Sequence, residues 1–136
     1  MAILRNSPIT SKIGTTVSSS IGISYPIKRG NSGYFSQTYD TLSQVKANLI
    51  CFFNTRRGER IMQPKLGSGL QELLFEQTIT DDAINSLIKE EIAVYFPELS
   101  IVSVNITRDT DNYKVNISIT FQIVNSNLTE TISIYL

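Results

Sequence analysis

The chain contains 136 residues, with 12 Lys and Arg residues against 12 Asp and Glu residues, so its net charge is zero. This length suits one domain of ordinary size. The sequence has no histidine and one cysteine, Cys51, which excludes Ser-His-Asp and Cys-His relays, an internal disulfide and the usual zinc sites. Zero net charge also argues against binding to nucleic-acid phosphates. We therefore expect no cofactor, no metal and no nucleic-acid partner.

The sequence also gives no sign of a membrane partner. No apolar run approaches the roughly 20 residues that cross a bilayer. The segment Met1–Pro8 does not combine a charged region with an apolar core, as a signal peptide does. We therefore expect a protein that neither spans nor enters a membrane.

Residues 1–20 are predicted to form a flexible N-terminal arm, separate from one domain over residues 21–136. In the arm, single apolar residues are scattered among Ser, Thr, Asn and Pro. Apolar residues then alternate along the chain at Ile21, Ile23, Tyr25 and Ile27. Pro26 restricts this segment to an edge strand or an extended docking segment.

The first helix is predicted near residues 39–54. Apolar residues there fall on one helical face, at Leu42, Val45, Leu49, Phe52 and Phe53. Asp40 or Thr41 can cap its start, and Asn54 with Gly58 marks its end. Cys51 lies inside this helix and is predicted to be a small core residue.

A second, longer amphipathic helix is predicted after a glycine turn. Gly67, Ser68 and Gly69 form the turn, and Leu70–Phe75 forms a short helix or turn. Thr80 is the expected N-cap of the long helix, with Asp81 and Asp82 in its first turn. Its buried stripe is predicted to contain Ile84, Leu87, Ile88, Ile92 and Tyr95. Pro97 ends the helix.

The apolar period then changes from about 3.6 residues to 2. Apolar residues alternate with polar ones in three segments: Val102, Val104 and Ile106; then Tyr113, Val115, Ile117, Ile119, Phe121 and Ile123; then Ile132, Ile134 and Leu136. This pattern predicts a three-stranded antiparallel meander with one face on the core. The predicted class is α+β, with two amphipathic helices packed on a C-terminal β meander.

The last strand is predicted to leave an unprotected sheet edge. It contains Thr131, Ile132, Ser133, Ile134, Tyr135 and Leu136, and lacks the lysines, prolines and bulges that usually block strand addition. Either the N-terminal arm covers this edge, or a partner exchanges a strand with it.

Charge is distributed unevenly along the chain. Residues 1–40 carry a net charge of +3, residues 41–69 carry +4, and residues 70–98 carry −6. These segments are either solvated faces of one protein or complementary patches that set the orientation of neighbouring subunits.

Paired carboxylates are the remaining option for catalysis, and they have weak support. Glu59, Glu72 and Glu76 flank the glycine turn, but a sugar-binding cleft normally adds stacking aromatic residues, and the chain has no tryptophan. Gly67-Ser68-Gly69 lacks the Lys-Ser/Thr that follows a phosphate loop. Arg56, Arg57 and Arg60 can grip a phosphate or pair with acidic groups of a protein, and the charge pattern favours the protein.

Two groups of residues within Phe53–Glu76 resemble a known family. The first follows the pattern Thr-x-x-Gly-Glu-Arg, at Thr55, Gly58, Glu59 and Arg60. The second follows Pro-x-x-Gly-x-x-Leu-x-x-x-x-Phe, at Pro64, Gly67, Leu70 and Phe75. With the helix and β hairpins that follow, the chain from about Gly22 resembles the small baseplate wedge proteins of contractile phage tails. That family was once labelled lysozyme-like, and type VI secretion baseplates contain a relative.

The resemblance implies a structural, non-enzymatic role in the virion, with assembly in the host cytoplasm. The implied partners are other baseplate wedge proteins and the tail sheath subunit, with the tail tube or hub as a further candidate and no small-molecule substrate. The implied function is to initiate sheath polymerisation by β-strand augmentation. The implied wedge-interface residues are the motif positions above and Pro97. Thr55–Arg60 can equally serve only to stabilise the fold.

The chain departs from the family at one motif. Many members carry Glu-Pro-Arg after the amphipathic helix, and that motif is implicated in contacts with neighbouring wedge subunits. The matching residues here are Phe96, Pro97 and Glu98, so only the proline is shared. The electrostatics of that contact are therefore not carried over to this chain.

Two alternatives remain open from the sequence. The first is a type VI secretion baseplate homologue, which has the same mechanics in a different assembly. The second is a peptidoglycan hydrolase, as the old family label suggests, with Glu59 and Glu72 as its carboxylates.

Overall fold

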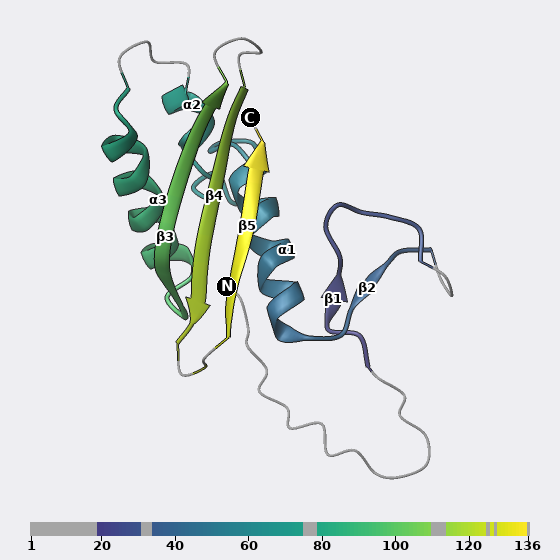
Figure 1. Cartoon of the computed structure of the whole chain (residues 1–136). Helices are drawn as coiled ribbons and strands as arrows, with labels where there is room; N and C mark the ends of the chain where they lie inside the picture. Colours follow the sequence, from purple (N-terminus) through teal and green to yellow (C-terminus); the bar gives the residue numbers. More distant parts are fainter. Residues whose placement is uncertain are drawn as a thin grey trace. The chain divides into compact units, whose positions relative to one another are not determined.

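A computed structural model describes residues 19–30, 34–74, 79–109, 114–124, 126 and 128–135 of the chain (Figure 1). The elements in chain order are β1 (Gly22–Ile23), β2 (Gln37–Thr38), α1 (Thr41–Asn54), α2 (Leu70–Leu74), α3 (Asp81–Tyr95), β3 (Leu99–Asp109), β4 (Lys114–Ile123) and β5 (Thr129–Tyr135). The chain divides into two compact units between Asn48 and Leu49, inside α1. Most of the predicted N-terminal arm lies outside the described residues, so the division at residue 20 stays a prediction.

The first unit contains a small antiparallel sheet of β1 and β2. Gly22 pairs with Thr38 in this sheet, and the Ile21 N–H donates to the Thr38 carbonyl at 2.8 Å. Within the segment predicted as an edge strand or docking segment, only Gly22–Ile23 thus forms a strand.

Asp40 caps the start of α1, as predicted. Its Oδ2 accepts a hydrogen bond from the Ser43 N–H at 2.9 Å. This bond favours the charged carboxylate and lowers the pKa of Asp40 below its ordinary value. Four of the five residues of the predicted apolar face are buried, and Leu42 is half-buried; the buried residues are Val45, Leu49, Phe52 and Phe53.

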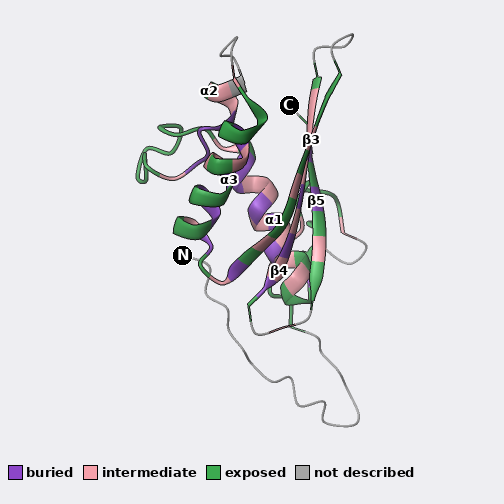
Figure 2. Ribbon diagram, turned by 60° about the vertical axis from the view of Figure 1, so that its left-hand side comes forward, coloured by how far each residue is buried: buried purple, intermediate pink, exposed green. Residues whose placement is uncertain are grey.

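The second unit contains the predicted meander, a sheet in the order β3-β4-β5 with antiparallel pairing throughout. Alternate residues of β4 and β5 are buried, as the period of 2 predicts. These residues are Ile117, Ile119, Phe121, Ile123, Ile132 and Ile134. Figure 2 shows that α3 lies along one face of this sheet, where it contacts β3. The predicted α+β class is confirmed.

One prediction for β3 is wrong. The sequence pattern placed Val102 on the buried face with Val104 and Ile106, but Val102 is exposed. The ladder shifts between Ile101, which pairs with Phe121, and Ser103, which pairs with Thr120. Val102 is therefore the extra residue of a β-bulge, and the bulge changes which residues face the core.

Before the bulge, the core-facing residues of β3 are at odd positions, and after it they are at even positions. Leu99 and Ile101 share the buried face with Val104 and Ile106, because all four pair with apolar residues of β4. A strict period of 2 cannot describe a strand that contains one extra residue.

An aromatic cluster joins the end of α1 to the end of α3. The Phe52 ring lies 4.9 Å from the Tyr95 ring and 5.5 Å from the Phe96 ring, measured between centroids, and the Phe96 contact is edge-to-face. Phe53 packs edge-to-face on Phe52 at 5.4 Å. Such pairs add to the burial of apolar area, so this cluster fixes the spacing of the two helix ends.

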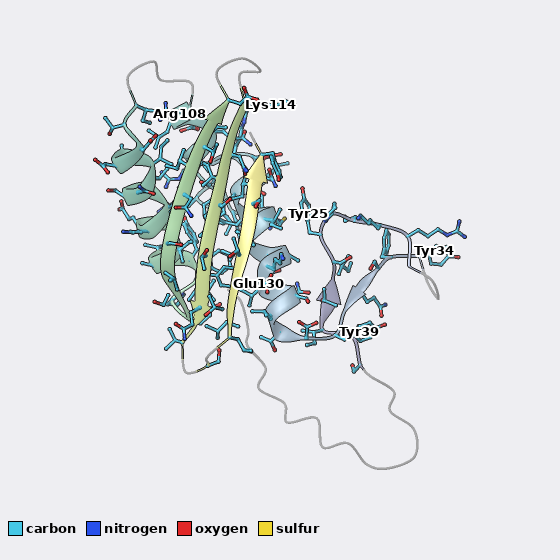
Figure 3. All side chains as sticks on the ribbon, viewed as in Figure 1. Tyr25, Tyr34, Tyr39, Arg108, Lys114 and Glu130 are labelled. Carbon is cyan, nitrogen blue, oxygen red and sulfur yellow. The ribbon has the colours of Figure 1, made fainter. Side chains whose placement is uncertain are left out.

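The start of α3 is held by an ion pair rather than by its N-cap side chain. Thr80 occupies the N-cap position with an extended backbone, but its hydroxyl makes no capping hydrogen bond, so that part of the prediction is wrong. Arg108 on β3 (labelled in Figure 3) donates to Asp81 Oδ1 at 2.6 Å and to the Ile79 carbonyl at 3.3 Å. Arg108 thus connects the strand to the first turn of the helix.

Candidate functional site

The family-motif residues lie in one connection, residues 55–69, which we call the motif loop. It begins where α1 ends and returns to the start of α2. At its base, the Ser68 N–H donates to the Thr55 carbonyl at 2.9 Å, and Arg56 and Ser68 form a parallel β-bridge. The two ends of the loop are therefore hydrogen-bonded to each other.

Gly67 is required by the closeness of these two ends. Its φ is +127°, which L side chains rarely adopt. A Cβ at this position would lie 2.7 Å from the carbonyl oxygens of both Thr55 and Arg56. Both the backbone angle and the lack of space therefore favour glycine.

Glu59 and Gly58 close a turn inside the motif loop. Glu59 Oε2 accepts a hydrogen bond from the Arg56 N–H at 3.0 Å, and the Glu59 N–H donates to the Arg56 carbonyl at 3.2 Å. Gly58, with a φ of +84°, donates its N–H to the Pro64 carbonyl at 2.8 Å. Gly58 and Glu59 thus stabilise the turn within the motif loop.

A buried carboxylate, Glu91 on α3, anchors the motif loop. Its side chain is 2% exposed, and Oε1 lies 2.9 Å from Arg57 Nη2. Oε1 also accepts from the Gly69 N–H at 2.8 Å, and Oε2 accepts from Ser68 Oγ at 2.6 Å. A buried carboxylate is tolerated when it is paired and hydrogen-bonded in this way.

Sequence reasoning missed Glu91, although a signal was present. Glu91 lies three residues after Ile88 and seven after Ile84, which places it on the buried stripe of α3. A carboxylate on an apolar stripe needs a charged or hydrogen-bonding partner. Arg57, 34 residues earlier in the chain, is that partner.

Two more side chains hold the motif loop to the helices. Tyr95 of α3 donates its hydroxyl to the Lys65 carbonyl at 2.6 Å. Arg56 Nε hydrogen-bonds to Gln71 Oε1 on α2. The loop is thus attached near its base and on its return path, while its outer part extends away from these contacts.

The outer part of the motif loop carries apolar side chains into solvent. Residues 56–65 are all exposed. Ile61 is 95% exposed and Met62 is 92% exposed, the highest values among the large hydrophobic residues that the structure describes. This tip is therefore an ordered surface with two adjacent apolar side chains.

The predicted wedge-interface residues divide into buried and exposed groups. Gly67 and Leu70 are buried, and Thr55 is half-buried. Gly58, Glu59, Arg60 and Pro64 are exposed in the motif loop, and Pro97 is exposed after α3. Phe75 lies outside the described residues.

At the segment that departs from the family, Phe96 is buried against Phe52. Its N–H donates to the Ile92 carbonyl at 2.8 Å, and its carbonyl accepts from the Leu99 N–H at 2.9 Å. This position therefore serves the core and the turn into β3.

The predicted strand-exchange edge is formed by β5. Ile132 and Ile134 are buried against the core, and Thr131, Ser133 and Tyr135 are exposed on the opposite face. Leu136 lies outside the described residues. In the described part of the chain, β5 has β4 as its strand partner on one side and no strand on the other (Figure 1).

The hairpin fixes which backbone groups of β5 point away from β4. The Ile123 N–H donates to the Leu128 carbonyl at 3.3 Å, so Ile123 and Leu128 form a hydrogen-bonded pair. Hydrogen-bonded and non-hydrogen-bonded pairs alternate in an antiparallel ladder. The backbone N–H and C=O groups that point outward therefore belong to Thr129, Thr131, Ser133 and Tyr135.

The described residues assemble no group of three or more His, Cys, Asp or Glu residues that could hold a metal ion. Of the predicted carboxylates, Glu59 is hydrogen-bonded within its own turn and Glu72 is exposed on α2. Glu76 lies outside the described residues. Among the described helices, none has the length and apolar character of a membrane span.

The described residues thus form an α+β protein with an open sheet edge at β5 and an anchored loop that ends in an apolar tip. The chain belongs to the family described as baseplate wedge protein gp25, whose sequence profile matches residues 40–128. The resemblance predicted from Thr55–Phe75 is thus confirmed, and with it the place of the chain as a structural protein of the tail baseplate.

Individual relatives agree with this assignment. The baseplate wedge protein gp25 of Enterobacteria phage T4 is 28% identical over 87 residues, which cover 62% of this chain. The match spans 66% of the length of that relative. A chain in the cryo-EM structure of the anti-feeding prophage baseplate is 28% identical, with a TM-score of 0.62, over 77% of this chain and 86% of that one.

A second similar structure supports the fold alone. It is a crystal structure from Geobacter sulfurreducens, described as a candidate tail lysozyme. It covers 71% of this chain and 90% of its own, with a TM-score of 0.64 and 20% identity.

Proposed function

We propose that this chain is a component of the inner baseplate wedge that binds neighbouring wedge proteins and initiates tail sheath polymerisation by β-strand augmentation at β5. The observation that carries this proposal is the open β5 edge. Every second residue of β5 directs its backbone N–H and C=O groups away from β4. These residues are Thr129, Thr131, Ser133 and Tyr135. A strand from a sheath subunit would add to this edge and extend the sheet.

The edge lacks the prolines, lysines and bulges that usually prevent such addition. Within Thr129–Tyr135 there is no proline and no lysine, and the pairing of β5 with β4 runs through seven consecutive residue pairs with no bulge. Glu130 is its one charged residue. An edge of this kind favours strand pairing over solvent exposure.

The outward face beside the edge is polar and already ordered. Thr131 Oγ1 lies 3.0 Å from Thr120 Oγ1, and Ser133 Oγ lies 3.5 Å from Ser118 Oγ on β4. These cross-strand pairs hold β5 in register. An incoming strand therefore meets a template whose register is fixed by the protein itself.

Substitution of Ser133 by proline tests the proposal. Proline removes one outward N–H, while the hydrogen bonds of β5 with β4 use the other residues of the strand. Baseplates that carry Ser133→Pro are expected to contain the chain but to start no sheath, as seen by electron microscopy with added sheath subunit. Ser133→Ala is the matched control, because it keeps the N–H and removes only the hydroxyl.

The melting temperature of the isolated variants separates the edge from the fold. Ser133→Pro and Ser133→Ala are expected to melt within a few degrees of the wild type. Normal sheath assembly on Ser133→Pro baseplates would show that β5 does not template the sheath.

A further inference from the structure

We propose that the tip of the motif loop, Ile61 and Met62 between Arg60 and Lys65, inserts into an apolar pocket rimmed by carboxylates on a neighbouring baseplate subunit. The inference rests on the wedge binding proposed above and names the part of the chain that makes the contact. It also describes the chemistry of the partner. It is independent of the β5 edge and of sheath initiation.

The exposure of the tip has no explanation within the fold of this unit. Ile61 and Met62 are almost fully exposed and adjacent in sequence. Single exposed apolar residues are common on protein surfaces, but two large ones together on a protruding tip form an apolar patch that water solvates poorly. Covering both side chains is therefore favourable for any complementary partner.

The tip is ordered before it meets a partner. The Gln63 N–H donates to the Arg60 carbonyl at 3.2 Å, and the Leu66 N–H donates to the Gln63 carbonyl at 3.0 Å. On either side, Gly58 bonds to Pro64 and Tyr95 bonds to Lys65. Little backbone conformational entropy is therefore lost on binding, because the backbone of the loop is preorganised.

None of these hydrogen bonds uses the side chain of Ile61 or Met62. The anchor at Glu91 reaches the loop through Arg57, Ser68 and Gly69, all outside the tip. The structure thus separates the residues that hold the loop from the residues that it displays. This separation makes a binding defect distinguishable from a folding defect.

Charge indicates the character of the partner. Arg60 and Lys65 flank the apolar pair, and neither forms an ion pair with a carboxylate of the described residues. The motif loop as a whole carries four basic residues against one acidic residue, Glu59. A pocket with an apolar floor and an acidic rim matches both features of the tip.

A protein partner is favoured over a membrane surface by the size and rigidity of the tip. Membrane-surface segments are typically amphipathic helices with an extended apolar face. The tip instead offers two apolar side chains on a fixed turn, which suits a single pocket. The family of the chain, whose members are baseplate proteins, provides such neighbours.

Oxidation of Met62 measures whether the tip is covered in the assembly. Besides Met1, it is the one methionine of the sequence, and hydrogen peroxide converts an exposed methionine to the sulfoxide. Mass spectrometry of the isolated chain and of purified baseplates gives the two rates. We expect oxidation in the baseplate to be at least about tenfold slower, as burial of the thioether implies.

Substitution of the tip measures its contribution to assembly. Ile61→Ser combined with Met62→Ser is expected to lower incorporation into baseplates by at least about tenfold, since two buried apolar anchors are lost. Gln63→Ser is the matched control, because Gln63 is an exposed polar residue next to the tip, and this variant is expected to assemble normally. Arg60→Glu is expected to reduce incorporation most strongly at low salt.

Unchanged melting of the isolated double-serine variant would show that its assembly defect is a binding defect. The inference is overturned if Met62 oxidises equally fast in baseplates, or if the variant is incorporated at the wild-type level. If the double-serine variant enters baseplates at the wild-type level but these baseplates start no sheath, the inference about the tip is also overturned. The proposed wedge role of the chain is left intact by that result. Comparison of the double-serine variant with Ser133→Pro therefore distinguishes failure of the tip proposal from failure of the β5 edge proposal.

Two further measurements test other partners for the tip, namely a second copy of the chain and a membrane. If the isolated chain self-associates in light scattering and the double-serine variant is monomeric, the partner is a second copy. If the chain sediments with phosphatidylglycerol vesicles and the variant does not, the partner is a membrane. Either result overturns the inference, whereas a chain that is monomeric and does not bind the vesicles supports it.

Discussion

Glu91 on α3 pairs with Arg57 across 34 residues of sequence, with 2.9 Å between Oε1 and Nη2. The carboxylate is buried, while the guanidinium is 48% exposed. The same carboxylate accepts hydrogen bonds from Ser68 and Gly69. One side chain of α3 therefore contacts the motif loop near both of its ends.

Replacing Glu91 by alanine is expected to destabilise the isolated chain by at least about 2 kcal/mol. The Gly69 N–H and the Ser68 hydroxyl then remain buried without an acceptor, and each such group costs about 1–3 kcal/mol. Arg57 adds little to this cost, because its exposed part is rehydrated. Denaturation in urea gives the free energy of unfolding. Glu90→Ala, at an exposed neighbouring position of α3, is the control and is expected to change it by less than about 0.5 kcal/mol.

Equal effects of Glu91→Ala and Glu90→Ala would show that the buried carboxylate does not anchor the loop. A further comparison with Glu91→Gln is informative, because glutamine keeps an acceptor but removes the charge. We expect Glu91→Gln to lie between the wild type and Glu91→Ala in its free energy of unfolding.

The two glycines of the motif loop provide a second prediction. Gly67→Ala combines a positive φ with a Cβ placed 2.7 Å from two carbonyl oxygens, and we expect a loss of about 3 kcal/mol or more in unfolding free energy. Gly58→Ala has a positive φ but nothing within 4 Å of its Cβ, so we expect a loss of about 1 kcal/mol. Urea unfolding of both variants measures the difference, and equal losses would contradict it.

The sequence predicted the elements of the fold because their signals are local. The stripe of α1, the alternation of β4 and the cap at Asp40 each depend on residues within a few positions of one another. The family motif is likewise a local pattern, and its residues from Thr55 to Gly67 all fall within the motif loop.

The remaining features are tertiary, because each depends on a residue of another element. The bulge at Val102 is visible only when Ile101 and Ser103 are matched to their partners on β4. The role of Glu91 depends on Arg57, which a different element supplies. Thr80 has the residue type of a good N-cap, yet the structure holds the start of α3 through Arg108 and Asp81.

The cap of α1 provides a prediction that depends on pH. The Ser43 N–H bond lowers the pKa of Asp40 in the folded protein, whereas an unfolded aspartate has a pKa of about 3.9. The unfolded state therefore takes up a proton first as pH falls. The stabilisation by the charged cap is fully present above about pH 5 and is lost as pH drops through the lowered pKa.

Asp40→Ala is expected to cost about 1 kcal/mol near neutral pH, the usual value of an N-cap side chain. Asp40→Asn is the matched control, since it keeps an acceptor for the Ser43 N–H but does not titrate. Melting temperatures at neutral pH and near pH 3 test both variants. We expect the difference between wild type and Asp40→Asn to change with pH, and a constant difference would rule out the charged cap.

The bulge in β3 provides the last prediction, on single-residue deletions. Ile101 and Ser103 already face the β4 residues that would be consecutive partners in a regular ladder, Phe121 and Thr120. Deletion of Val102 therefore leaves every remaining pair in place and converts the bulge into regular strand. We expect this variant to fold, with a change in unfolding free energy of about 1 kcal/mol or less, because only an exposed side chain is removed.

Deletion of Asn105, three residues further along the same strand, is the matched control. Asn105 pairs with Ser118 in the regular part of the ladder. Its deletion therefore shifts the pairing register with β4 by one residue for the part of β3 on one side of the deletion. Such a shift turns core-facing residues toward solvent, and we expect a loss of more than about 3 kcal/mol from the exposed apolar area. Circular dichroism and urea unfolding compare the two deletions, and comparable damage from both would mean that Val102 is not a dispensable bulge residue.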